Sequence, residues 1–369
     1  MARGHLTQAR RWTVVSGLSL VACLTIMPAR AAGTPLVFPD LVPDRADRLW
    51  LDGSHTAVGP SGEQRLLLRY DGYVHNRGPG SLEIRGSFPA ESTGETIMVT
   101  NVQRVYRGRP SQAHADFANP GLQLVYVPSL NHQHFHVRGI VSYQLVEAGT
   151  GAVTEESAKN RVGFCLIDAE SRDADAATQA GYTPAASNDC GYRDPAAAAV
   201  TMGLSAGWRD RYWRELQYQW VDVSDVQPGV YQLHPVADPD DVIREEDESN
   251  NDAGGSEDVA ATIPGYQATP IEARTLGGAP TAIELGATRF SSAIEGAPQP
   301  GSVEFRIVRQ PQHGHLLVSG EAWASGATAV YIPNTTYKGA DSFSYVARDH
   351  DHPLFPREPK PAGVKVTVG

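Results

Sequence analysis

The chain has 369 residues, of which 36 are glycine, 26 are proline and only three are cysteine. This length is enough to bury a large core, and it excludes a small peptide held together by disulfides alone. The formal net charge is −11 and no basic tract is present, so we expect no nucleic-acid partner.

Residues 1–31 are predicted to be a secretory signal peptide. Three arginines precede an apolar run at residues 12–27, and Ala29-Arg30-Ala31 suits a cleavage site. The run is too short and interrupted for a transmembrane segment, and no later stretch is a better candidate. We therefore expect a secreted or periplasmic protein. The alternative is a lipoprotein anchored at Cys23, because Leu-Val-Ala-Cys has the order of a lipidation site.

The strand pattern begins at residues 64–86, where alternating apolar and polar residues predict two strands joined by a turn at residues 76–80. Similar runs predict further strands, at residues 122–127, 140–146, 219–223 and 230–235. One short helix is expected at Gly207–Leu216. The fold class is therefore all-β, a β-sandwich with little helix.

Two cysteines, Cys165 and Cys190, lie after the predicted signal peptide and before the predicted helix. They form an even pair once the signal peptide is removed. In an oxidising compartment such a pair is expected to form one disulfide.

Residues 236–258 are strongly acidic and poor in apolar residues, which is typical of a solvated linker. We place a domain boundary near Ile263-Pro264, giving a domain at 32–262 and a second at 263–369. The second contains short β runs, and PQHGHLLVSG, AVYIPN and YKGADSFSYVARD resemble the cadherin-like or immunoglobulin-like repeat of extracellular proteins. That resemblance implies a β-sandwich and a cell-surface or matrix partner.

The segment HQHFH carries three alternating histidines, His132, His134 and His136. Alternate residues of a strand project from one face, but on a flat strand the outer two Cα atoms are about 13 Å apart. The histidines can therefore share one ion only if the strand bends. Imidazole ligands without thiolate suit copper, zinc or nickel. The alternative is a polar surface stripe.

Two further motifs are interpreted as non-catalytic. Gly203-Leu204-Ser205-Ala206-Gly207 matches the nucleophile elbow of hydrolases, but the alternating βαβ architecture that this motif needs is not predicted. The run Asp349-His350-Asp351-His352 follows a predicted strand, so we expect a solvated loop there.

At the histidines the chain resembles the lysyl oxidase family, whose copper-binding segment is similar to NHQHFH. The resemblance continues, in family order, through FPDLVPD (38–44), GFCLID (163–168), GLSAGWRDRYWRELQYQWVDVSDVQPGVYQL (203–233) and EEDESNN (245–251). It covers roughly residues 38–251 and implies a lysyl oxidase-like β-sandwich domain.

The resemblance implies that the three histidines bind copper and that Tyr212 is oxidised, with molecular oxygen, to a quinone. In the family this quinone is cross-linked to a lysine, giving lysine tyrosylquinone, a carbonyl electrophile that captures primary amines. The products would be aldehydes, hydrogen peroxide and ammonia.

The cross-linking lysine is where this sequence departs from the family. That lysine stands three residues before the Phe of the FCL motif, a position occupied here by Arg161, so Lys159 in a loop-like stretch is the alternative. Two functions follow. The first is a copper-dependent amine oxidase acting on primary amines, including lysyl side chains, and the second is a non-catalytic copper-binding or adhesive extracellular protein that lost the quinone.

The resemblance also implies a calcium site. Its side chains carry oxygen atoms, which are the ligands that a hard cation such as calcium prefers. Its ligands would tie the start of the domain to its end: Asp40, the carbonyl of Leu41, Glu245, Asp247, Asn250 and Asn251. The alternative is an acidic linker with ordinary turn residues.

Overall fold

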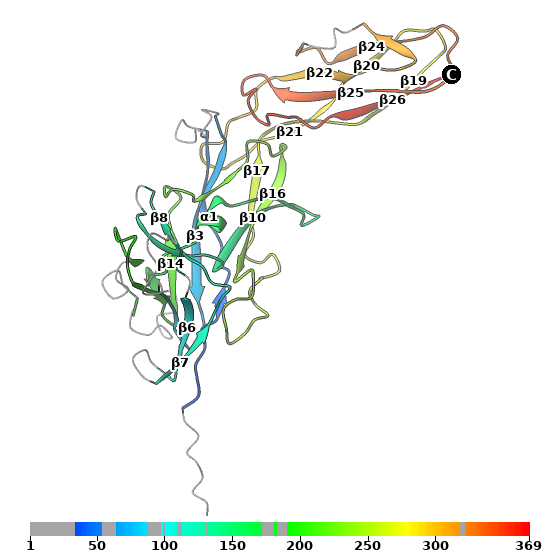
Figure 1. Ribbon diagram of the computed structural model, residues 1–369. Coiled ribbons are helices and arrows are strands. Elements are labelled where there is room, and N and C mark those ends of the chain that lie inside the picture. The colour runs from blue at the N-terminus through cyan, green and yellow to red at the C-terminus, as the bar shows by residue number, and fades with distance from the viewer. Residues whose placement is uncertain are drawn as a thin grey trace, which may run out of the picture. The chain divides into compact units, whose positions relative to one another are not determined.

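The computed structural model describes residues 34–53, 64–87, 97–98, 100–108, 113–129, 132–171, 181–182, 190–317 and 322–369 (Figure 1). The predicted signal peptide and Cys23 lie outside these residues. No helix in the described ranges is long and apolar enough to cross a membrane.

The fold is all-β, as predicted. The strands up to residue 263 are β1 (Leu41–Val42), β2 (Asp47–Asp52), β3 (Leu67–Asn76), β4 (Leu82–Ser87), β5 (Ile97–Met98), β6 (Thr100–Tyr106), β7 (His114–Ala118), β8 (Leu124–Val127), β9 (His134–Val137), β10 (Val141–Glu147), β11 (Val153–Glu156), β12 (Glu170–Ser171), β13 (Ala199–Leu204), β14 (Trp208–Tyr212), β15 (Trp220–Asp222), β16 (Gly229–Ala237) and β17 (Val259–Ile263). The helix among the described residues is α1 (Ala158–Val162).

These strands surround one hydrophobic core with β3 at its centre (Figure 1). All ten residues of β3 are buried, and β1, β2, β14 and β15 all pair with it. The other sheets have the orders β11-β10-β16-β17, β13-β4-β6-β7 and β5-β8-β9. The histidine strand β9 therefore lies at one edge of a small sheet, paired with β8.

The strands predicted at residues 122–127, 140–146, 219–223 and 230–235 are confirmed as β8, β10, β15 and β16. The stretch 64–86 also yields two strands, β3 and β4. These two do not pair with each other, because β3 joins the central sheet and β4 joins β13 and β6.

The helix predicted at Gly207–Leu216 is wrong. Trp208–Tyr212 forms strand β14, paired with β3 through Tyr212 opposite Gly72. Asp210 and Tyr212 are buried on one face, the period-two pattern of a strand. The helix lies instead at α1, in the stretch expected to be a loop, where the Ser157 hydroxyl caps its first turn.

The predicted disulfide between Cys165 and Cys190 is confirmed, with Cα atoms 6.0 Å apart. The two cysteines are 25 residues apart in the sequence, and Cys165 follows shortly after the end of α1. Both cysteines lie in the first core.

A second core collects residues from Tyr266 onward. Its strands are β18 (Gly265–Ala268), β19 (Ile271–Thr275), β20 (Thr281–Glu284), β21 (Ala287–Phe290), β22 (Val303–Arg309), β23 (Gly314–Leu316), β24 (Thr328–Pro333), β25 (Gly339–Asp349) and β26 (Ala362–Val368). The sheets β19-β26-β25-β22 and β20-β24-β23 both contribute buried aromatics, including Phe343 and Tyr331. The domain boundary at 262/263 and the immunoglobulin-like or cadherin-like assignment stay predictions.

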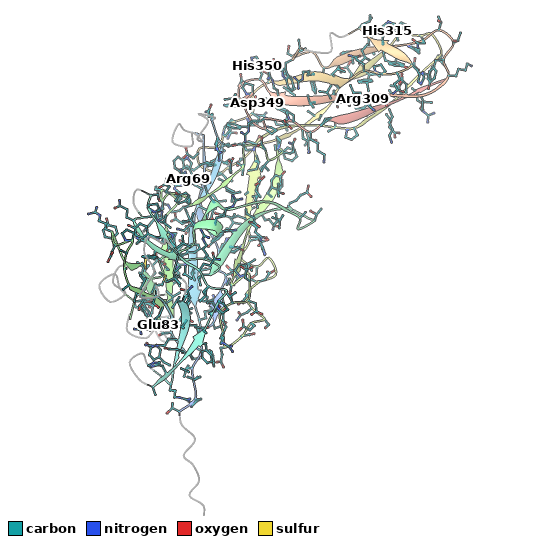
Figure 2. All side chains as sticks on the ribbon, viewed as in Figure 1. Arg69, Glu83, Arg309, His315, Asp349 and His350 are labelled. Atoms are coloured by element: carbon teal, nitrogen blue, oxygen red, sulfur yellow. A yellow bond between two sulfur atoms is a disulfide. The ribbon has the colours of Figure 1, made fainter. Side chains whose placement is uncertain are left out.

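The Asp349–His352 run lies where β25 ends, in the part of the chain where Figure 2 labels Asp349 and His350. His350 Nδ1 lies 2.9 Å from Glu304 Oε1, and His352 Nδ1 lies 2.9 Å from Asp349 Oδ2. The side chains of His350 and His352 are 58% and 43% exposed, which agrees with the expected solvated loop.

Candidate metal and tyrosine site

Three imidazoles meet at the start of β9. Gln133 adopts a left-handed backbone conformation (φ 55°), which breaks the strand between His132 and His134 and supplies the bend that a shared site requires. His132 Nδ1 lies 3.2 Å from His136 Nε2, and His134 Nε2 lies 2.9 Å from the same atom. One nitrogen of each ring therefore faces a common point.

The backbone fixes which nitrogen of two of these rings is free to bind a metal. His132 Nε2 lies 3.3 Å from the carbonyl oxygen of Gln217, and His136 Nδ1 lies 3.1 Å from that of Val162. A carbonyl only accepts, so these nitrogens carry the protons and the opposite nitrogens keep their lone pairs. Such outer hydrogen bonds are what orients histidine ligands in metal sites.

Burial keeps the three rings neutral. It lowers the pKa of His132 and of His134 to about 4 and the pKa of His136 well below its usual value, and the nearby charge of Lys159 acts in the same direction. Neutral imidazoles are the form that binds a metal.

The donor set fits one copper-sized ion. Metal–nitrogen bonds of about 2.0–2.1 Å at angles of 90–109° separate two ligand nitrogens by about 2.9–3.4 Å. The nitrogen separations of 3.2 and 2.9 Å lie in this range. Three imidazoles without thiolate or carboxylate suit copper, zinc or nickel.

Lys159, on α1, is fully buried beside this cluster. Its Nζ lies 4.4 Å from the centre of the Tyr212 ring and 5.0 Å from that of Phe164. Within the described residues this Nζ has no hydrogen-bond partner. Burial lowers the pKa of Lys159 to about 7, so a large fraction of the amine is neutral near physiological pH.

The segment after α1 is attached directly to the histidine strand. Val137 and Phe164 exchange two backbone hydrogen bonds of 2.8 Å. Gly163 has φ 78°, and a Cβ there would overlap the carbonyl oxygen of Val137, so only glycine fits this close approach. This bridge holds Lys159 and His136 on adjoining segments.

Tyr212 is held at both ends of its side chain. Its hydroxyl donates to the carbonyl oxygen of Cys165 at 2.6 Å, and its ring meets Phe164 edge-on with centroids 4.6 Å apart. Burial and the neighbouring Asp210 raise the pKa of Tyr212 well above its usual value. The ring is thus a fixed, neutral phenol in contact with a lysine amine.

Asp210 lies two residues before Tyr212 on the same face of β14 and is buried. Its carboxylate accepts hydrogen bonds from the backbone N–H groups of Ile167 and Arg211. Burial nevertheless raises the pKa of Asp210 to about 8. This carboxyl can therefore hold or release a proton near neutral pH, close to Tyr212.

Arg161, at the position where the family carries its lysine, is exposed to solvent. Lys159 lies on the opposite side of the same helical turn and points inward. The structure brings Lys159, not Arg161, to Tyr212.

Two tyrosines border the more open side of the histidines. The Tyr192 ring lies 6.4 Å from that of His134, and the Tyr218 ring lies 5.8 Å from that of His132. Tyr192 is 44% exposed and His134 is the least buried of the three histidines, so solvent reaches the site from this side.

The expected calcium residues converge in part. The Leu41 N–H donates to Glu245 Oε2, and Asn250 Nδ2 donates to Asp40 Oδ1 at 3.0 Å, although more than 200 residues separate each pair. Buried oxygens without a described partner remain there, on the side chains of Glu245, Asn250 and Asn251. Asp247 instead is fully exposed and accepts hydrogen bonds from Ser249.

Burial and the neighbouring carboxylates raise the pKa of Glu245 to about 9. A carboxyl in this environment gains from a cation at the same place. The acidic stretch is therefore folded against the start of the domain, not a free linker.

The hydrolase alternative stays rejected. The Ser205 hydroxyl donates to Asp168 Oδ2 at 2.8 Å, and the same oxygen accepts the N–H groups of Gly181 and Tyr182. Ser205 is thus part of a buried turn. A nucleophilic serine would instead pair with a basic histidine.

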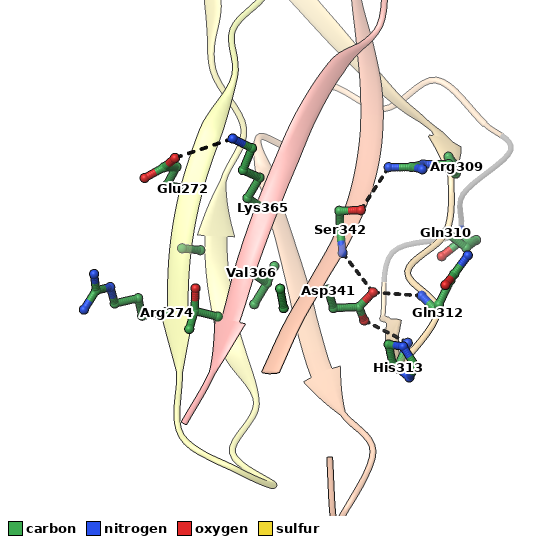
Figure 3. Close-up of a pocket in the computed structure, with 13 residues that line it drawn as sticks. Glu272, Arg274, Arg309, Gln310, Gln312, His313, Asp341, Ser342, Lys365 and Val366 are labelled. Carbon is green, nitrogen blue, oxygen red and sulfur yellow. Dashed lines mark hydrogen bonds and ion pairs between the residues drawn. The ribbon is translucent and has the colours of Figure 1, made fainter. Parts of the chain in front are cut away.

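A groove of about 790 Å³ lies on the outer face of the sheet formed by β19, β26 and β25 (Figure 3). Asp341 there accepts the backbone N–H groups of Gln312 and His313, and Lys365 pairs with Glu272. The groove is lined mainly by charged and polar side chains, whereas the convergent imidazoles and the buried contact between Lys159 and Tyr212 lie elsewhere, so the candidate site is the histidine and tyrosine region.

Residues 104–257 match the family model described as lysyl oxidase. Protein-lysine 6-oxidase of Rattus norvegicus is 37% identical over 122 residues, which make up 32% of this chain and 25% of that protein. The Homo sapiens protein of the same name is 35% identical over 122 residues, with the same two shares. The chain thus spans about a quarter of the length of these relatives.

Among solved structures, DIP-gamma IG1+IG2 is 13% identical with a TM-score of 0.17, covering 64% of this chain and 86% of that one. A likeness this remote supports no argument about fold or function.

Proposed function

We propose that this chain, which is similar to lysyl oxidases over residues 104–257, is a copper-dependent oxidase of primary amines, including lysyl side chains. Its cofactor would be lysine tyrosylquinone built from Tyr212 and Lys159. Molecular oxygen would be the second substrate, and aldehydes, hydrogen peroxide and ammonia the products. The non-catalytic copper-binding protein is the alternative.

One observation carries this proposal: Lys159 Nζ lies 4.4 Å from the Tyr212 ring, without a hydrogen-bond partner in the described part of the chain. A buried lysine needs a reason to be where it is, because burial disfavours its charged form. An amine with a pKa of about 7 is a competent nucleophile near neutral pH. Arg161 does not compete for this role, since it faces solvent.

Copper would be held by His132 Nδ1, His134 Nε2 and His136 Nε2. When bound, copper with dioxygen supplies the oxidising equivalents that convert a neighbouring tyrosine to a quinone. The carbonyls of Gln217 and Val162 keep two of the ligands in the correct tautomer, so little reorganisation is needed on binding.

Proton movement at the site falls to the chain's own groups. The Tyr212 hydroxyl is already committed to the carbonyl of Cys165, which fixes the ring in its plane. Asp210, with a pKa of about 8, can exchange a proton near neutral pH, and its ionised form can accept protons when the tyrosine is modified and when an amine substrate is deprotonated.

We also propose that calcium joins the two ends of the domain, through Asp40, the Leu41 carbonyl, Glu245, Asn250 and Asn251. The unpartnered oxygens of Glu245, Asn250 and Asn251 support this site. Asp247 would have to turn away from Ser249 to reach the ion.

Export to an oxidising compartment, secreted or periplasmic, is part of the same proposal, and the disulfide supports it. A cell-surface or matrix partner for residues 263–369 is proposed on the cadherin-like pattern of that sequence.

The test is a peptide map of protein loaded with copper in air, followed by phenylhydrazine labelling. We expect a cross-linked peptide that joins Lys159 to Tyr212, a hydrazone absorbance, and peroxide release with primary amines. Lys159→Met should lose all three, a loss of at least about 100-fold, because among the described residues Lys159 is the amine that contacts the ring. The matched control Arg161→Met should keep them.

An unmodified Tyr212 in copper-loaded wild-type protein, with no peroxide from any amine, would refute the oxidase. The copper-binding scaffold would then be the better description. A cross-link that persists in Lys159→Met would show that another residue supplies the amine.

A further inference from the structure

Gln219 has a side-chain amide that the fold itself does not use. The residue is fully buried, yet within the described residues neither Oε1 nor Nε2 has a hydrogen-bond partner. A buried amide left unpaired costs roughly 1–3 kcal/mol, so its presence needs an explanation.

The position of this amide follows from the pairing of β3 with β14. Gly72 lies directly opposite Tyr212, and residues that face each other across an antiparallel pair project from the same face. A Cβ placed on Gly72 would lie 2.5 Å from Gln219 Nε2. The amide thus fills the space of the missing side chain, beside that of Tyr212.

Two other aromatic rings enclose the same space. Tyr70 and Tyr143 each bring a ring carbon to 3.2 Å from the point where the Gly72 Cβ would be. Their hydroxyls are used elsewhere, on Ser157 and on the backbone of Tyr73. The hydroxyls around the amide are therefore engaged, and its N–H groups are still available.

We infer that Gln219 is a positioning residue for Tyr212 after its oxidation: its amide N–H donates to the oxygen that the ring gains. This inference rests on the proposed function, because the additional ring oxygen that accepts the hydrogen bond exists only after tyrosine has been oxidised to the quinone. A donor held in place before the oxygen arrives orients the ring without further rearrangement. Gly72 is part of the same arrangement, because any larger residue would displace the amide.

The experiment compares wild-type protein with Gln219→Met, which keeps the length of the side chain and removes its amide. Metal-free Gln219→Met should unfold at or above the wild-type temperature, because an unpaired amide contributes nothing to folding. Copper content should stay at the wild-type value. The yield of phenylhydrazine adduct at Tyr212 should fall at least about 10-fold, or the absorption maximum of the adduct should move.

A second variant, Gly72→Ala, displaces the amide without changing it and should alter the adduct in the same way. Gln232→Met, on β16, is the control for the substitution itself and should leave adduct and spectrum unchanged.

The outcomes separate this inference from the proposed function. A wild-type adduct that Gln219→Met reproduces in yield and spectrum overturns the inference and leaves the oxidase intact. A Gln219→Met protein that unfolds at a clearly lower temperature also overturns it, because the amide would then stabilise the fold. Copper-loaded wild type without any adduct refutes the oxidase, and the role of Gln219 falls with it.

Discussion

The histidine region and the acidic region both fasten distant parts of the chain, but they do so in opposite ways. Around His136 the fold is already closed, by the Cys165–Cys190 disulfide and by the two hydrogen bonds between Val137 and Phe164. Around Glu245 the closure leaves several buried oxygens without a donor among the residues that the structure describes, and the pKa of this carboxyl is raised to about 9.

This difference indicates what each region requires of a cation. The histidines are neutral, and the outer nitrogens of His132 and His136 are hydrogen-bonded, so we expect the site to keep its geometry whether or not copper is bound. The acidic region gathers like charges that favour folding only when a cation balances them. Copper is then expected to serve chemistry, and calcium to serve stability.

The largest effect should come from removing one of the proposed copper ligands. His134→Ala should reduce copper affinity at least about 100-fold, because two imidazoles remain where three converged. His134 is the most exposed of the three, so the metal-free variant should unfold within about 0.5 kcal/mol of wild type. Copper content per chain and thermal unfolding measure the two quantities.

The control for this variant is His315→Gln, which changes an exposed histidine of β23. It should leave copper content unchanged. Wild-type copper content in His134→Ala would mean that the ion binds elsewhere.

Calcium should have the next largest effect. At a concentration about 100 times its dissociation constant, calcium should stabilise the fold by about 2.7 kcal/mol, and a chelator should reverse the gain. Glu245→Gln should lose this response and, without calcium, should be at least as stable as wild type, because folding no longer has to raise the pKa of this carboxyl. Glu246→Gln, an exposed neighbour, is the matched control.

Differential scanning calorimetry with and without the ion decides the point. A wild-type melting temperature that is indifferent to both calcium and chelator would leave only the folded acidic loop, without a bound cation.

The two regions differ in how much of their structure the sequence predicts. The strands, the disulfide and the shared histidines follow from alternation, cysteine number and spacing, which are local properties. The bend at Gln133 was recognised as a requirement, although its place in the chain depends on a backbone conformation that glutamine rarely adopts.

The residues around Tyr212 were harder to predict, because their conformation is decided by partners far along the chain. The charged run at 207–216 is compatible with a surface helix, and only pairing with β3 makes it a strand. The sequence places Lys159 in a loop-like stretch, and nothing in it predicts that this side chain is buried, because lysine is almost never fully buried. Asp210 and Gln219 were missed for a related reason, since their faces are defined only once β14 and Gly72 are paired.

The smallest expected effect is a pair of opposite pH slopes in the metal-free protein. For His132 and His134 the folded pKa of about 4 lies below the unfolded value of 6.5, so the unfolded chain binds more protons between these values. Their contribution to stability therefore rises with pH from 4 to 6.5. For Glu245 the folded pKa of about 9 lies above the unfolded value of 4.5, so its contribution falls as pH rises from 4.5 to 9.

The slope due to Glu245 can be isolated by urea unfolding of wild type and Glu245→Gln in chelator, from pH 6.5 to 9. Wild type should lose stability relative to the variant by at most about 1.4 kcal/mol per pH unit, and by less where solvent screens the carboxylate. Glu246→Gln should follow wild type, and saturating calcium should abolish the difference in slope, because the bound ion requires the ionised carboxylate. If stability depends on pH in the same way for wild type and Glu245→Gln in chelator, the pKa of Glu245 is not raised on folding. The contrast between the two regions would then rest on the histidines alone.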